Sequence, residues 1–168
     1  MMEGEFGAIW RMLRVLTRGK INTIHANDRK EMRRPSAIVR ILVVDDFEPF
    51  RRFLCEALKA RLQLQVVGEA LDGLEALQKA KDLQPDLVLL DIGLPKLNGI
   101  EAAKSLSRIV PDAKILFVSQ CNDADVMAVA MSNGAKGYVW KQTAQSELLP
   151  AVEAILRDDR FVSSQLQS

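Results

Sequence analysis

Residues 87–109 read LVLLDIGLPKLNGIEAAKSLSRI, and this stretch decides the fold. It opens with four apolar residues that close on Asp91, a pattern typical of a strand buried on both faces of a parallel sheet. After a turn that contains a proline, Asn98 and Glu101 have the spacing of a capping box, which predicts a helix from Asn98 to Ile109. The stretch is therefore a strand followed by a helix, with an acidic residue where the strand ends.

The same alternation extends along the chain in both directions. Short apolar or β-branched runs predict strands, and apolar residues at helical spacing predict helices. The predicted strands are 40–44, 64–70, 87–90, 113–118 and 137–140, and the predicted helices are 49–61, 73–83, 98–109, 123–133 and 146–157. Strands that alternate with helices in this way indicate a parallel sheet covered on both faces. We therefore expect a doubly wound α/β domain with a five-stranded parallel sheet.

The composition is that of an ordinary folded domain. The chain has 168 residues, of which 48% are hydrophobic and 27% are charged, and its formal net charge is +1. A chain of this length can build a core without a disulfide or a metal. The small net charge gives no electrostatic reason to expect nucleic-acid binding. The single histidine and the two cysteines form no metal-binding pattern.

Residues 1–37 are interpreted as a basic leader or linker, ahead of a folded domain at 38–158 and a C-terminal tail or linker start at 159–168. Residues 1–40 hold 9 Lys/Arg against 4 Asp/Glu, a net charge of +5, whereas the remaining residues hold 14 against 18, a net charge of −4. A short basic amphipathic helix is predicted over 8–16. No signal peptide is evident, and no apolar run approaches the roughly 20 residues that span a bilayer. We therefore expect a cytoplasmic protein without a membrane partner.

Polar side chains follow four of the five predicted strands. Asp45 and Asp46 follow the first strand, Asp91 the third, Ser119 the fourth and Lys141 the fifth. Each of them alone would be interpreted as a turn or cap residue. The carboxyl ends of parallel strands lie along one edge of the sheet, however, and ligands bind there. The joint arrangement therefore predicts one site built from residues that are distant in sequence.

The residue types at this edge indicate phosphoryl chemistry. Two unit charges about 4 Å apart cost about 4 kcal/mol at an effective dielectric near 20, so three neighbouring carboxylates need positive charge beside them. Mg²⁺ prefers oxygen ligands from one or two carboxylates, water and phosphate. A carboxylate beside Mg²⁺ and Lys141 can attack phosphorus and become an acyl phosphate. Ser119 can then donate a hydrogen bond to a phosphoryl oxygen.

Residues 39–162, about three quarters of the chain, resemble the receiver domain of bacterial response regulators. The matching segments are ILVVDD (41–46), LVLLDIGLPKLNGIEAAKSL (87–106), ILFVS (115–119), NGAKGYVWK (133–141) and SELLPAVEAIL (146–156). The segment with the third strand is the most specific of them. The resemblance implies a flavodoxin-like fold with the strand order 2-1-3-4-5.

The resemblance also implies a role for the acidic residues. Asp91 would be the phosphoacceptor. Asp45 and Asp46 would bind Mg²⁺ together with Asp91, and the backbone carbonyl of Gly93 would complete the protein ligands.

A second group of residues would contact or follow the phosphoryl group. In the family Lys141 would contact its oxygens, and the Ser119 hydroxyl would move toward it on activation, followed inward by the aromatic side chain of Tyr138. Two neighbours depart from the family pattern. Gln120 stands where a small residue is usual, and Cys121 offers no carboxylate or amide to position an attacking water. We therefore expect slow autodephosphorylation.

The function implied is that of a signalling module and not of an enzyme in its own right, although the domain would assist its own phosphotransfer and dephosphorylation. A sensor histidine kinase would phosphorylate Asp91, and phosphorylation would shift the protein between an inactive and an active conformation. A homodimer is a second partner to consider. The details resemble the LuxR-type branch, whose members continue into a helix-turn-helix domain. Because the sequence ends at Ser168, we expect either a single-domain regulator or a truncated receiver, with no DNA binding by the residues present.

Two other functions stay open. One is a phosphohydrolase that also forms an aspartyl phosphate, but such enzymes usually carry a DxD pattern after the first strand, and here Asp45 and Asp46 are adjacent. The other is a receiver-like interaction module that works without phosphorylation. The complete set of site residues disfavours that module, whereas Gln120 beside the site favours it.

Overall fold

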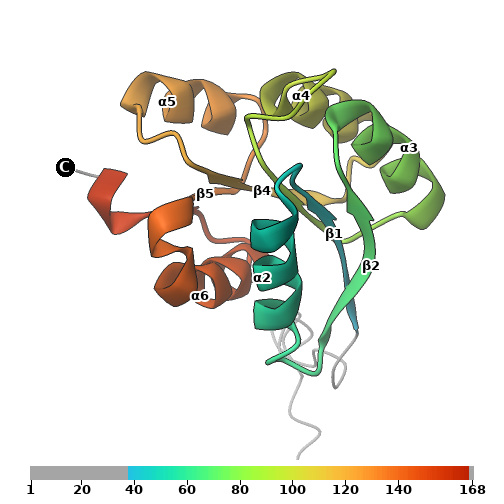
Figure 1. The fold of residues 1–168 in the computed structure, drawn as a ribbon, viewed down its shortest axis with the longest axis horizontal. Coiled ribbons are helices and arrows are strands. Elements are labelled where there is room, and N and C mark those ends of the chain that lie inside the picture. Colours follow the sequence, from blue (N-terminus) through green and yellow to red (C-terminus); the bar gives the residue numbers. More distant parts are fainter. Residues whose placement is uncertain (1–37, 167–168) are drawn as a thin grey trace, which may run out of the picture. The chain divides into compact units, whose positions relative to one another are not determined.

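The computed structural model describes residues 38–166, which form a parallel sheet with helices on both faces (Figure 1). The sheet has six strands in the order β2-β1-β3-β4-β5-β6. The strands are β1 (Val39–Val44), β2 (Leu64–Ala70), β3 (Leu87–Leu90), β4 (Lys114–Ser119), β5 (Gly137–Trp140) and β6 (Phe161–Val162). The predicted order 2-1-3-4-5 is confirmed for the first five. The sixth strand was not predicted, and it adds a parallel partner at the free edge of β5.

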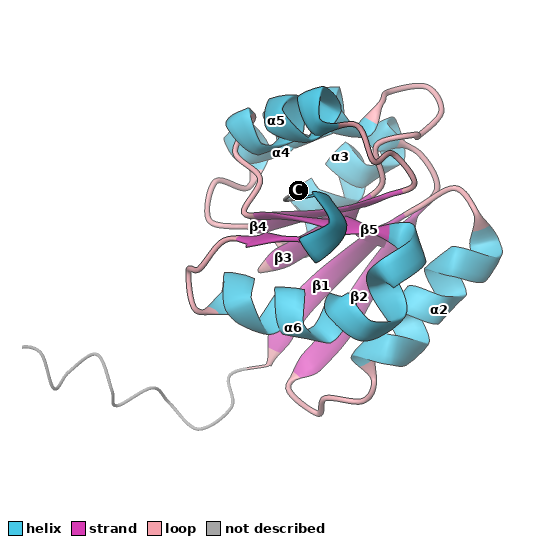
Figure 2. Ribbon diagram, turned by 90° about the vertical axis from the view of Figure 1, so that its left-hand side faces the viewer, coloured by secondary structure: helices cyan, strands magenta, loops and turns pink. Residues whose placement is uncertain are grey.

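Five α-helices connect the strands. They are α2 (Glu48–Leu58), α3 (Gly73–Leu83), α4 (Gly99–Ile109), α5 (Ala124–Ser132) and α6 (Ala144–Leu156), and a short 3-10 helix, η2 (Lys141–Thr143), precedes α6. Helices α2 and α6 cover one face of the sheet, and α3, α4 and α5 cover the other (Figure 2). The predicted fold class, a doubly wound α/β domain of the flavodoxin-like type, is confirmed. The last helix begins two residues before the predicted 146, because the turn of η2 leads directly into it.

Both faces of the sheet are buried, which explains the near-continuous apolar strands. In β1, Leu42 and Val44 pack in the cluster beneath α3, α4 and α5. Their neighbours Ile41 and Val43 pack in the cluster beneath α2 and α6. Because successive side chains of a strand point to opposite faces, every position of such a strand must be apolar.

The start of α4 fixes the loop that follows β3. The side chain of Asn98 caps the helix by accepting a hydrogen bond from the backbone N–H of Glu101 at 3.0 Å, as the capping-box spacing predicted. Gly99 packs against the backbone of Asp91, and a Cβ at this position would lie 1.9 Å from the Asp91 carbonyl oxygen. The loop between Asp91 and the helix is therefore anchored at both of its ends.

Two features predicted from the sequence concern residues that the structure does not describe. The basic leader at 1–37 and the amphipathic helix at 8–16 lie outside the described residues. Among the helices of residues 38–166, none is long and apolar enough to cross a membrane.

Candidate functional site

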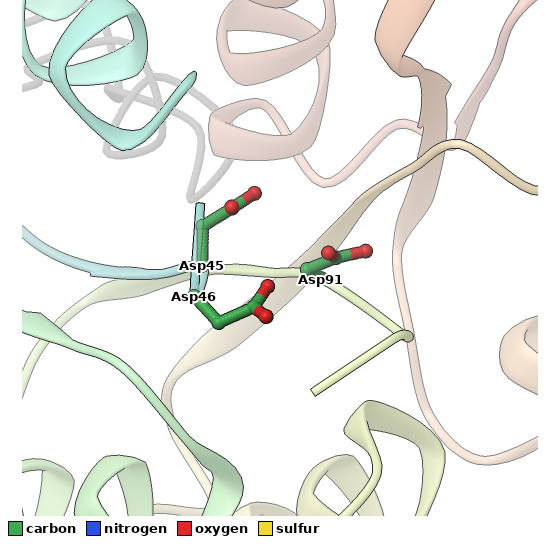
Figure 3. Close-up of side chains that lie close together, drawn as sticks. All are labelled: Asp45, Asp46 and Asp91. Atoms are coloured by element: carbon green, nitrogen blue, oxygen red, sulfur yellow. The ribbon is translucent and has the colours of Figure 1, made fainter. Parts of the chain in front are cut away.

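The predicted site residues meet at the carboxyl edge of the sheet. Asp45 directly follows β1 and Asp91 directly follows β3, and these two strands are neighbours. One carboxylate oxygen from each of Asp45, Asp46 and Asp91 lies within 4.8 Å of the others (Figure 3). Asp45 and Asp91 are buried, whereas Asp46 is exposed. The group can therefore be reached by a ligand on the side of Asp46.

Lys141 joins this group from the end of β5, as predicted. Its Nζ donates a hydrogen bond to Asp91 Oδ2 at 2.8 Å and lies 2.6 Å from Asp45 Oδ2. The Lys141 side chain is only 7% exposed. One ammonium group thus pairs with two of the three carboxylates, which leaves an excess of negative charge at the site.

The donor set suits a hard divalent cation. Asp45 Oδ2 is buried and has no aligned hydrogen-bond donor among the described residues, although Lys141 Nζ is close to it. An oxygen with unused lone pairs beside two further carboxylates is the kind of ligand group that Mg²⁺ takes. The acidic cluster can therefore hold a metal ion. Residues Asp45, Asp46 and Asp91 would supply its carboxylate ligands.

Burial shapes the ionisation of the two innermost groups. Burial raises the pKa of Asp45, against the opposing effect of the Lys141 ammonium group. Burial also disfavours the charge of Lys141, but hydrogen bonds and charges from Asp45 and Asp91 outweigh it and raise the pKa of this lysine. Lys141 is therefore a permanently charged partner of the cluster at neutral pH.

The two predicted switch residues are tied to the loop between β4 and α5. Ser119 is 3% exposed, and its Oγ accepts a hydrogen bond from the Cys121 N–H at 3.2 Å. Tyr138 is fully buried, and its hydroxyl donates to the Cys121 carbonyl at 2.8 Å. Burial raises the pKa of Tyr138 to about 12, so its side chain is a neutral donor. Both residues thus bind the backbone of Cys121.

Gly93 and Gln120 are near the site, and their contacts do not test the roles predicted for them. The Gly93 N–H donates to Asp91 Oδ1 at 3.3 Å, and the role of its carbonyl as a metal ligand stays a prediction. The Gln120 side chain is exposed, and its backbone carbonyl accepts a hydrogen bond from Trp140 Nε1 at 3.1 Å. The slow loss of a phosphoryl group, which was predicted from Gln120 and Cys121, stays a prediction as well.

Sequence reasoning missed two residues that touch the site from α2. The Phe50 ring lies beneath the Lys141 ammonium group, with Nζ 4.7 Å from the ring centroid. Arg51 donates from its guanidinium to the Asp45 carbonyl at 2.9 Å and forms an ion pair with Glu69 at 2.8 Å. In the sequence, Phe50 carries only the signal of an apolar helix position.

Residues 41–153 match the response regulator receiver domain family. The chain belongs to this family. The matched range contains every residue that we predicted for the site, and four of them, Asp45, Asp46, Asp91 and Lys141, lie together at the carboxyl edge of the sheet. The alternation of strands and helices and the acidic cluster therefore agree with the family to which the sequence belongs.

Individual relatives support the same assignment. The receiver is 36% identical over 129 residues to response regulator GacA of Pseudomonas viridiflava, a match that covers 77% of this chain and 60% of that protein. It is 35% identical over 116 residues to the chemotaxis protein CheY of Thermotoga maritima, which covers 69% of this chain and 96% of that one. The crystal structure of a LuxR-family two-component response regulator from Aurantimonas sp. SI85-9A1 is 33% identical, with a TM-score of 0.74 over 78% of this chain and 94% of that chain.

These relatives confirm the predicted likeness to LuxR-type receivers. The chain spans about 60% of the length of the GacA proteins that it matches. The similarity to them is therefore a similarity of the receiver, and the activity of the whole relatives does not follow from it.

Proposed function

We propose that this receiver accepts a phosphoryl group on Asp91 and works as the phosphorylation-controlled module of a two-component system. The observation that carries the proposal is the position of the Asp91 carboxylate. It lies at the end of β3, 2.8 Å from Lys141 Nζ and within the same cluster as Asp45 and Asp46. The Asp91 carboxylate, a potential nucleophile, thus lies beside the Lys141 ammonium group and beside two carboxylates that can help to bind Mg²⁺.

The transfer needs a phosphorylated donor, and the family points to the phosphohistidine of a sensor histidine kinase in the cytoplasm. An Asp91 oxygen forms a bond to phosphorus while the phosphorus–nitrogen bond breaks, and the electron pair stays on the departing imidazole. Lys141 neutralises charge on the phosphoryl oxygens, and Ser119 donates a hydrogen bond to one of them. Mg²⁺ held by the acidic cluster would supply further positive charge to these oxygens.

The same contacts suggest how phosphorylation changes the conformation. Ser119 Oγ accepts from Cys121 N–H in this structure, and Tyr138 donates to the Cys121 carbonyl. A Ser119 hydroxyl that turns toward a phosphoryl oxygen gives up its contact with Cys121. The loop that holds Tyr138 would then shift, so phosphorylation favours a second arrangement of the β4–α5 loop and β5. That second arrangement could act by favouring a homodimer.

The test is phosphorylation by a small donor. The protein is incubated with Mg²⁺ and acetyl phosphate, and its intact mass is measured beside an Asp91→Asn variant. We expect the wild type to gain one phosphoryl group and the variant to gain none. If neither gains mass, binding of beryllofluoride, which imitates the phosphoryl group without a transfer step, is measured by ¹⁹F NMR. Failure of both would overturn the proposal in favour of a module that works without phosphorylation.

A further inference from the structure

An aromatic ring covers the ammonium group of Lys141. Nζ lies 4.7 Å from the centroid of the Phe50 ring, over the ring itself. This is within the distance of about 6 Å at which the negative face of an aromatic ring attracts a cation. Phe50 is the third residue of α2 (Glu48–Leu58), so it follows the loop that carries Asp45 and Asp46.

The ring completes the surroundings of the ammonium group. Asp91 accepts its hydrogen bond at 2.8 Å, and Asp45 Oδ2 is 2.6 Å away. These two carboxylates come from the ends of β3 and β1, whereas Phe50 comes from a helix on one face of the sheet. A lysine side chain is a point charge on a flexible stem and has no rigid geometry of its own. Its position is therefore set by groups from three separate elements.

The two carboxylates do not fix the lysine by themselves. When Asp91 carries a phosphoryl group and Asp45 binds a metal ion, both present fewer free oxygens to Lys141. The Phe50 ring takes no part in either event, so its contact with the ammonium group remains available. It is also uncharged, and it therefore holds the cation without competing with a phosphoryl group for it.

Packing alone is the competing explanation for Phe50. The ring also packs against Phe53, with the ring centroids 5.5 Å apart, and both side chains border the core cluster beneath α2 and α6. Among residues 38–166, however, Phe50 is the one whose ring lies over Lys141. Phe53 therefore provides a matched aromatic residue on the same helix that packs in the same cluster.

We infer that Phe50 is a positioning residue for Lys141: its ring holds the ammonium group in place for contact with the phosphoryl oxygens. The inference rests on the proposed phosphorylation of Asp91. Phe50 acts through Lys141, whose ammonium group lies over its ring.

The first experiment compares phosphorylation rates with limiting acetyl phosphate, followed by intact mass. Phe50→Leu keeps an apolar side chain but removes the ring, and we expect its rate to fall about three- to tenfold, as the usual strength of a cation–π contact implies. Phe50→Tyr keeps the ring and is expected to restore a rate close to that of the wild type. Phe53→Leu is the control for lost aromatic packing and is expected to leave the rate close to that of the wild type.

The second experiment asks whether the effect passes through Lys141. Phe50→Leu is combined with Lys141→Gln, which we expect to be phosphorylated slowly and to keep the acidic cluster. In this background we expect the additional Phe50→Leu change to have no further effect, because a double-mutant cycle isolates the contact between the two residues. The affinity for Mg²⁺, measured by calorimetry, is expected to be the same in Phe50→Leu and in the wild type.

The outcomes separate the inference from the proposed function. Phosphorylation of the wild type and its loss in Asp91→Asn establish the acceptor, whatever happens at Phe50. The inference is overturned if Phe50→Leu matches the wild type, if Phe53→Leu is slowed as much, or if the full Phe50→Leu effect persists in Lys141→Gln. A Phe50→Leu protein that fails to fold, as judged by urea unfolding, is replaced by Phe50→Met, to which the same expectations apply.

Discussion

Asp45 is the most enclosed acidic side chain of the candidate site, with 1% of its side chain exposed. Its Oδ1 accepts a hydrogen bond from the Phe47 N–H at 2.9 Å, while Oδ2 faces Lys141. The backbone therefore orients the carboxylate through Oδ1, and Oδ2 keeps lone pairs that can bind a cation. Burial raises its pKa, and a nearby cation such as the Lys141 ammonium group favours its charged form.

Removing the charge of Asp45 should impair the metal site specifically. We expect Asp45→Asn to weaken Mg²⁺ binding at least about tenfold, since the loss of a supporting residue of a metal site already costs that much. Calorimetric titration with Mg²⁺ measures the affinity. Asp112→Asn is the control, because Asp112 is exposed in the turn before β4, at the opposite edge of the sheet. Equal Mg²⁺ affinities in Asp45→Asn and the wild type would contradict the assignment.

The sequence predicts that the charged residues belong to the site, but it does not predict that Phe50 does, and the difference has a physical reason. Asp45, Asp91 and Lys141 stand at strand ends, and the parallel sheet brings all strand ends of one kind to the same edge. Phe50 has no comparable rule behind it. Its contact with Lys141 depends on how α2 lies against the end of β5, and the spacing of apolar residues along a helix does not report that.

At the scale of the elements, the start of α4 is where the fold supports the site most directly. Asn98 caps the helix, and the next residue, Gly99, donates its N–H to the Ile92 carbonyl at 2.9 Å. The helix therefore begins against the backbone of Ile92, the residue that follows Asp91. The absence of a side chain at Gly99 is what allows this close approach.

A methyl group at Gly99 should therefore destabilise the domain. A Cβ there would lie 1.9 Å from the Asp91 carbonyl oxygen, which the backbone can relieve only by moving. We expect Gly99→Ala to lower the free energy of unfolding by about 1–3 kcal/mol, the usual cost of overpacking. Gly93→Ala is the matched control, since its nearest contact would be 3.9 Å from Asp91 Oδ2. Urea unfolding measures both, and equal losses in the two variants would refute the explanation.

The elements also differ in how well the sequence predicts them. The capped helix after β3 and the apolar runs of β3 and β4 carry strong local signals, and the structure contains them. Strand β6 carries none, because Phe161 and Val162 are too few to show a period of two. It forms because the chain that leaves α6 returns along β5, which is a matter of tertiary structure.

At the scale of the whole domain, the sheet is extended at the β5 edge by the domain's own C-terminal segment. The Ser163 N–H donates to the Tyr138 carbonyl at 2.9 Å, and Ser163 Oγ accepts from the Trp140 N–H at 2.9 Å. Strand β5 leads directly into Lys141. The segment after α6 thus runs along β5 as far as Trp140, the residue immediately before Lys141 of the candidate site.

Glu147 on α6 holds this segment in place. Its Oε2 accepts hydrogen bonds from the hydroxyls of Thr143, at 2.6 Å, and of Ser163. Its Oε1 accepts from the hydroxyl of Ser164 at 3.1 Å and from the Ser164 N–H at 3.3 Å. Burial opposes the charge of Glu147, but these hydrogen bonds outweigh it and lower the pKa of its carboxyl group. The ionised carboxylate is therefore favoured by folding.

This carboxylate should make part of the stability depend on pH. Because folding lowers the pKa of Glu147, its contribution is complete above the ordinary glutamate pKa of about 4.3 and is lost as the pH falls through the lower value of the folded state. We expect Glu147→Gln to be less stable than the wild type at pH 7 in urea unfolding, and this difference to shrink as the pH falls below about 4.3. Glu153→Gln on the same helix is the control, because Glu153 only pairs with Arg61 at an exposed position and such pairs contribute little. A Glu147→Gln difference that does not shrink as the pH falls below about 4.3 would show that the segment is held by the pairing of β6 with β5 and not by the charge of Glu147.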